Sequence, residues 1–184
     1  MTFDEQVAYY ETHPPKCIEQ FQAVAIPAPD IPIDGHAGDN INTFWLLRCS
    51  CGNESFFLHG YDYYAPNYGM VFISPLHAQC TSCNGKTLLL DTDKHGYDPV
   101  AVGGPVSTYH GLTEDGAAPA LCNCNRCRAE KFQLTVRFEF SSDNFDYPID
   151  ELIGREADLF SWTSVIGSCD TCGFEDVLAE FECA

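Results

Sequence analysis

Positive charge is scarce in this sequence. Nine Lys and Arg residues stand against 27 Asp and Glu residues, so the 184-residue chain carries a formal net charge of −18. Because an acidic surface repels phosphate backbones, this balance counts against DNA or RNA as the partner. It suits solubility, and it also suits a protein partner with a basic surface.

Long apolar runs are missing as well. No stretch approaches the roughly 18 apolar residues of a membrane span. Residues 1–5 lack the basic and apolar regions that open a secretion signal. We therefore expect a cytoplasmic protein whose thiols stay reduced. Hydrophobic residues still make up 45% of the chain, which is enough to build a core.

Cysteine, by contrast, is abundant, with 11 residues. In a reducing compartment, closely spaced cysteines favour metal binding over disulfides, and the odd count argues against complete pairing. Eight of them form four knuckles, a knuckle being two cysteines separated by one or two residues. The early knuckles are Cys49 with Cys51 and Cys124 with Cys127, and the late knuckles are Cys80 with Cys83 and Cys169 with Cys172.

The knuckles have the chemistry of a zinc site. Zinc takes four ligands in a tetrahedron, and thiolate suits it well. A tight turn that directs two cysteines at one ion favours Gly or Asn, in the left-handed conformation, directly after the second cysteine. Gly52, Asn84 and Gly173 occupy that position, whereas Arg128 departs from the pattern. We predict two structural zinc ions, each held by an early and a late knuckle: Cys49, Cys51, Cys80 and Cys83 for one, and Cys124, Cys127, Cys169 and Cys172 for the other.

Three features leave alternatives open. Cys122 and Cys124 form another close pair, which would mimic the Cys-x-Cys of the first early knuckle. His77 lies just before the first late knuckle and could replace a cysteine as a ligand. Cys17 and Cys183 have no local partner, so we interpret them as core or surface thiols.

The two halves of the chain also resemble each other. Glu, Phe and Leu recur at the third, fifth and seventh positions after Cys51 and after Cys127, and an apolar run precedes each late knuckle. This shared order predicts an internal duplication. The pattern Cys-x-Cys-Gly to Cys-x-x-Cys, then Cys-x-x-Cys to Cys-x-x-Cys-Gly, resembles the zinc-ribbon group of folds. That resemblance implies a structural metal and often a binding role, but no shared activity.

The remaining pattern predicts a β-rich α+β fold. Residues 1–40 read as an N-terminal helical segment, interrupted at Pro14 and Pro15, followed by a Pro-rich linker. Residues 41–98 form the first zinc-ribbon-like half, residues 99–119 a linker, and residues 120–184 the second half. Apolar and polar residues alternate over 132–140, which predicts a strand with one buried face. A short helix is expected to begin at Pro148.

We interpret the chain as an acidic, zinc-stabilised protein-binding module of the inhibitor or immunity type that docks on a basic partner. One alternative is an enzyme with its site in the 34–40 loop or in a cleft between the halves, although the six histidines form no catalytic motif. The other is a nucleic-acid binder that uses the basic residues within 126–137, namely Arg126, Arg128, Lys131 and Arg137. The acidic residues expected to contact a basic partner are Asp143, Asp146, Asp150, Glu114 and Asp115.

Overall fold

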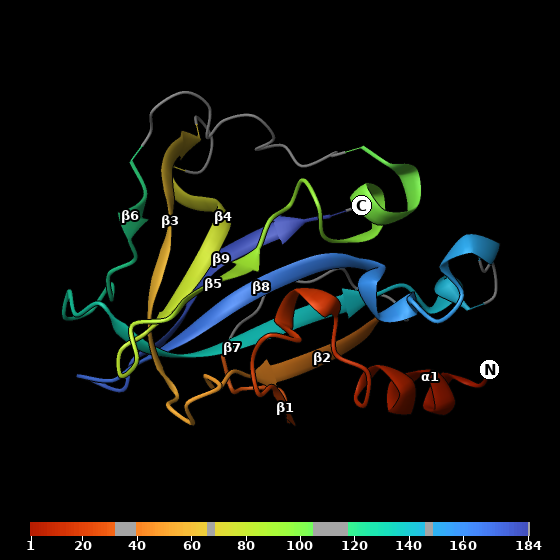
Figure 1. Cartoon of the computed structure of the whole chain (residues 1–184), viewed down its shortest axis with the longest axis horizontal. Coiled ribbons are helices and arrows are strands. Elements are labelled where there is room, and N and C mark those ends of the chain that lie inside the picture. The colour runs from red at the N-terminus through yellow and green to blue at the C-terminus, as the bar shows by residue number, and fades with distance from the viewer. Residues whose placement is uncertain (32–39, 66–68, 105–117, 146–148, 184) are drawn as a thin grey trace.

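The computed structural model describes residues 1–31, 40–65, 69–104, 118–145 and 149–183, which consist mainly of β-strands (Figure 1). This confirms the β-rich class expected from the sequence. The strands are β1 (Val24–Ile26), β2 (Ile41–Leu46), β3 (Ser55–Ala65), β4 (Gly69–Cys80), β5 (Lys86–Leu90), β6 (Ala120–Leu121), β7 (Lys131–Phe140), β8 (Phe160–Cys169) and β9 (Glu175–Glu182). The helical elements are α1 (Phe3–Tyr10), η1 (Lys16–Ile18), η2 (Asp98–Val102), η3 (Ser142–Asn144), η4 (Asp150–Leu152) and η5 (Glu156–Asp158).

The strands join in one antiparallel sheet centred on β7. In the strand order β1-β2-β7-β3-β4-β5, both β2 and β3 bond to β7, along successive stretches of the same edge. β8 covers the other edge of β7 and pairs in turn with β9, while β6 pairs with β3. The sheet curls, so β4 and β9 lie close together although they are not neighbours in the strand order (Figure 1).

The sequence of β7 explains its central place. Phe132, Leu134, Val136, Phe138 and Phe140 are all buried, which confirms the strand and the buried face predicted from their alternation. Toward the end of β7 the intervening residues are buried too, so the strand is covered on both faces there. Side chains from both sides of the 99–119 segment pack into the same core.

The α-helix of the N-terminal segment lies before its prolines. A capping box opens α1, in which Glu5 donates its N–H to the Thr2 hydroxyl and its carboxylate accepts the Thr2 N–H. The helix ends at Tyr10, whose buried ring stacks on Phe140 with the ring centroids 3.8 Å apart. After Pro14 and Pro15 the chain makes the single turn η1 and then enters β1. The start expected for a helix at Pro148 lies outside the described residues, and the single turns η4 and η5 follow it.

Candidate metal centres

The eight knuckle cysteines gather in two groups, and in each group the four Sγ atoms lie within 4.8 Å of one another. The turns that carry them lie at the same end of the sheet, at the left in Figure 1. The groups are the two sets expected from the sequence. Site A contains Cys49, Cys51, Cys80 and Cys83, and site B contains Cys124, Cys127, Cys169 and Cys172.

The sulfur separations have the dimensions of a tetrahedral metal site. Two Sγ–Sγ distances between the early and late knuckles of site A are both 3.6 Å, and the corresponding Sγ–Sγ distances in site B are 3.7 and 3.6 Å. A Zn–S bond of about 2.3 Å places two sulfurs of a tetrahedron about 3.8 Å apart, whereas a disulfide bond is only about 2.05 Å long. The sulfur pairs measured are Cys49–Cys83, Cys51–Cys80, Cys124–Cys172 and Cys127–Cys169.

Each knuckle closes with a residue in the left-handed conformation. The backbone angle φ is +88° at Gly52, +58° at Asn84, +65° at Arg128 and +66° at Gly173. In every knuckle this residue donates its N–H to the carbonyl oxygen of the first cysteine, at 2.8 to 3.0 Å. Arg128 therefore departs from the other three in residue type but not in conformation.

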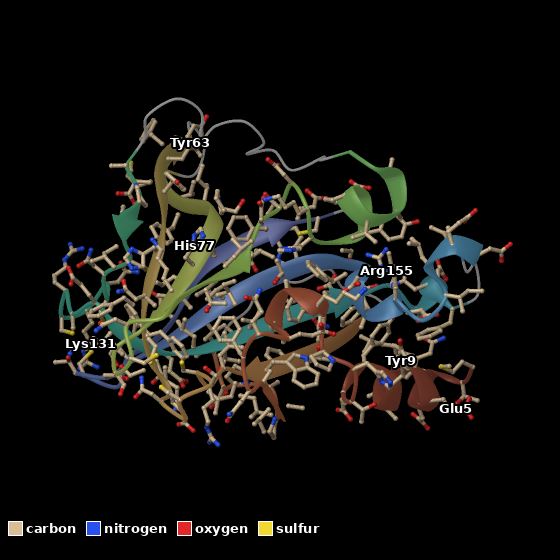
Figure 2. The ribbon with its side chains drawn as sticks, viewed as in Figure 1. Glu5, Tyr9, Tyr63, His77, Lys131 and Arg155 are labelled. Carbon is tan, nitrogen blue, oxygen red and sulfur yellow. The ribbon has the colours of Figure 1, made fainter. Side chains whose placement is uncertain are left out.

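Strand register brings each late knuckle back beside its early partner. Cys80, the last residue of β4, pairs with Phe56 of β3, and Cys169, the last residue of β8, pairs with Phe132 of β7. The residue after each of these cysteines donates its N–H to the carbonyl of the residue before each phenylalanine, at 3.1 and 3.0 Å. Figure 2 shows Lys131, which opens β7, at this end of the molecule.

Polar groups around Cys80 orient its sulfur. The side-chain amide of Asn53 donates to the Cys80 Sγ at 3.3 Å, and the backbone N–H of Ser82 donates to it at 3.4 Å. Asn53 is itself held by the Ser55 carbonyl at 2.7 Å and the Thr81 hydroxyl at 3.2 Å. Such donors fix the direction of a metal ligand and stabilise its thiolate form.

The thiols within each site differ in acidity. Burial raises the pKa of Cys80, but backbone N–H groups of its own turn and the Asn53 amide outweigh this and lower it to about 6. The Asn53 N–H lowers the pKa of Cys51, yet the neighbouring sulfurs raise it to about 11. In site B, burial raises the pKa of Cys124 but backbone N–H groups bring it to about 7. One backbone N–H lowers the pKa of Cys127, while burial and three neighbouring sulfurs raise it to about 12. A metal cation bound among the four sulfurs of a site would favour their thiolate forms.

Cys122 lies outside site B. It follows β6, where its N–H donates to the Leu58 carbonyl at 2.9 Å. Burial raises the pKa of its thiol to about 12, so it is poorly suited to ionise. The pair that the structure places beside the late knuckle is Cys124 and Cys127.

His77 and the two isolated cysteines also stand apart from both sites. His77 lies opposite His59 across β3 and β4, and within the described ranges both groups consist of cysteine alone. Cys17 and Cys183 are buried, and burial raises the pKa of both thiols. They are core thiols.

The basic residues near site B do not form one surface. Arg126, Arg128 and Lys131 are exposed. Arg137 is only 3% exposed and donates to the Glu139 carboxylate at 2.5 Å. Placing Arg137 in a surface cluster was wrong, because β7 is covered on both faces at that point.

The acidic residues expected to contact a partner are described only in part. Asp143 in η3 and Asp150 at the start of η4 are exposed. Their role in docking stays a prediction. Outside the described residues lie Glu114, Asp115, Asp146 and residues 34–39 of the loop considered for an enzyme.

In the part of the chain that the structure describes, no helix is long and apolar enough to cross a membrane. Comparison with known proteins gives no matching family model, no similar curated protein and no similar solved structure. The geometry of the described residues provides two clusters of four cysteines that are suited to metal ions.

Proposed function

We propose that this chain is a zinc-stabilised, acidic protein-binding module in which two four-cysteine zinc sites hold a rigid β-sheet. The observation that carries the proposal is the gathering of eight thiols into sites A and B at tetrahedral separations. Four-sulfur tetrahedral sites suit zinc or iron, and zinc adds stability without redox chemistry. Because cysteine fills all four positions of each site, no position stays open for a substrate, as a catalytic zinc requires.

We further propose that the sheet arose by duplication of a zinc-ribbon-like unit. Each unit begins with an early knuckle, continues with two paired strands and the late knuckle, and ends with a third strand. The strands of the first unit are β3, β4 and β5, and those of the second are β7, β8 and β9. In both units the phenylalanine five positions after the early knuckle pairs with the first cysteine of the late knuckle. A duplicated unit would keep this register, and η3 to η5 form an insertion between β7 and β8 of the second unit.

Charge supports a basic protein as the partner. Each four-thiolate zinc site adds a formal −2, which moves the total from −18 to about −22. Such a surface speeds association with a basic partner, and a rigid binder loses less entropy on docking. Asp143 and Asp150 are exposed on the turns between β7 and β8, where they can make such contacts. We place the module in the cytoplasm, in an inhibitor or immunity role.

The experiment captures a partner from the native host on immobilised, zinc-loaded protein at low salt, and then measures affinity with the purified partner. We expect Asp143→Asn/Asp150→Asn to weaken binding by about tenfold and to slow association. The control is Glu130→Gln/Glu175→Gln, which removes the same charge from exposed positions beside site B. If the two double variants weaken binding equally, general charge explains the association and the proposed contact is wrong.

A further inference from the structure

A pocket of about 200 Å³ opens away from the two metal sites, between η1, the segment before η2, and η5 with the start of β8. The side chains that matter for its chemistry are Lys16, Lys94, His95, Arg155, Asp158 and Phe160. Figure 2 places Arg155 far from Lys131, which marks the end of the sheet that carries the knuckles.

The pocket concentrates positive charge in an acidic protein. Three of the nine basic residues of the chain line it, against one lining carboxylate, that of Asp158. That carboxylate is shared, because the Lys16 ammonium lies 3.5 Å from it and the Arg155 Nε lies 3.4 Å from it. The Lys16 backbone N–H also donates to it at 2.9 Å. Lys16 and Arg155 thus share one carboxylate, while Lys94 pairs with the carboxylate of Asp91 beside the pocket.

Arg155 keeps donors for a ligand. Within the residues described, its contact to Asp158 runs through Nε, so the two terminal nitrogens remain to bind an anion. An arginine uses such a fork to hold a carboxylate or phosphate through two parallel hydrogen bonds. Its side chain is partly exposed, as expected for a group at a pocket entrance.

A tight turn presents Lys94 and His95. The N–H groups of both residues donate to the Asp91 carbonyl, at 3.0 and 2.9 Å, and the Lys94 ammonium lies 2.5 Å from the Asp91 carboxylate. The Asp91 N–H donates to the Nδ1 atom of His95 at 3.0 Å. This contact places the proton of the neutral ring on Nε2, which becomes a donor. Burial lowers the pKa of His95, which favours that neutral form.

The rest of the pocket is apolar and rigidly built. Phe160 is buried at its wall. Gly96 has φ of +103°, and a Cβ added there would lie 2.4 Å from the Cβ of Cys183 and 3.3 Å from the Phe160 ring. The N–H of Asp98 donates to the Cys183 carbonyl at 2.9 Å, which ties this segment to the end of β9. The pocket is therefore pre-formed by close packing.

We propose that this pocket binds a small organic anion, one that carries a phosphate or carboxylate group on a short apolar body. The Arg155 fork, the Lys94 ammonium and the His95 Nε2 hydrogen bind the anionic group, and Phe160 contacts the apolar body. Pockets for drug-sized ligands occupy about 300–1,000 Å³, so the ligand here is smaller than these.

The test titrates the zinc-loaded full chain with inorganic phosphate and, separately, with malonate, following the His95 ring resonances by NMR. We expect saturable shifts with at least one of the two anions, and the one that binds more tightly identifies the anionic group. Arg155→Gln/Lys94→Gln should weaken that binding by about tenfold. The control, Arg126→Gln/Lys86→Gln, removes the same charge at exposed positions outside the pocket and should leave affinity within about twofold.

Two results would overturn the proposal. One is the absence of saturable binding by both anions. The other is equal weakening in the two double variants, which would show attraction to overall charge only. Melting temperatures of both variants close to that of the native chain establish that folding is unaffected, since the four side chains replaced are exposed or partly exposed.

Discussion

Phe56 of β3 lies directly opposite Phe132 of β7, and both side chains are buried. On its other side Phe56 pairs with Cys80 of site A, and Phe132 pairs with Cys169 of site B. Because paired residues in antiparallel strands point to the same face, one row of buried side chains crosses four strands from site to site. Sites A and B are thus linked through the core of the sheet.

This row predicts a large stability loss on truncation of either ring. Phe56→Ala should lower the free energy of unfolding of the zinc-loaded protein by about 3–5 kcal/mol, since it leaves a cavity at the centre of the sheet. Denaturation in urea measures the change. Phe3→Ala is the control, because Phe3 is 50% exposed in α1 and should change stability by less than about 0.5 kcal/mol. A similar small loss for both variants would contradict the central role of the row.

The same row predicts that damage to one site reaches the other. Cys80→Ser should reduce bound zinc from two ions to one, and hydrogen exchange should quicken in β7 and β8 as well as in β3 and β4. Cys122→Ser is the matched control, because Cys122 lies outside both groups and its loss should leave both zinc ions bound. Unchanged protection in β7 and β8 would mean that the units fold independently.

Replacing the left-handed residue of the second early knuckle, Arg128, should stabilise the protein rather than destabilise it. Arg128 has φ of +65°, which costs a residue with a Cβ about 1–2 kcal/mol. Arg128→Gly should therefore raise the free energy of unfolding by up to about 1 kcal/mol, which is measured as a higher melting temperature. Arg126→Gly is the control, because Arg126 does not have positive φ and glycine there only adds freedom to the unfolded chain. A loss of stability in Arg128→Gly would show that the arginine side chain is needed at the knuckle.

The knuckles could be predicted because their signal is local. Two cysteines within four residues, followed by Gly52, Asn84 or Gly173, specify a turn whatever the rest of the chain does. Arg128 gave no such signal, since closure of the turn forces its conformation. The repeated spacing of Glu, Phe and Leu likewise pointed to corresponding positions, and Phe56 and Phe132 do occupy equivalent places in the register.

Long-range packing had no comparable signal. Arg137 sits at a polar position of an alternating strand, which is typical of a solvent-facing residue, but the curled sheet covers both faces of β7 there. The pairing of β2 with β7 joins segments separated by the whole of the first unit, and no local pattern specifies it. The Arg155 pocket draws on η1, residues 94–96 and residues 155–160, so no sequence spacing could indicate it.

Elemental analysis of protein purified without added metal tests the central claim most directly. Two four-cysteine sites predict two zinc ions per chain. In the folded protein, the thiols of the eight ligand cysteines should resist alkylation until a chelator removes the metal. Less than one equivalent of zinc, together with reactive thiols at sites A and B in the folded protein, would contradict the account.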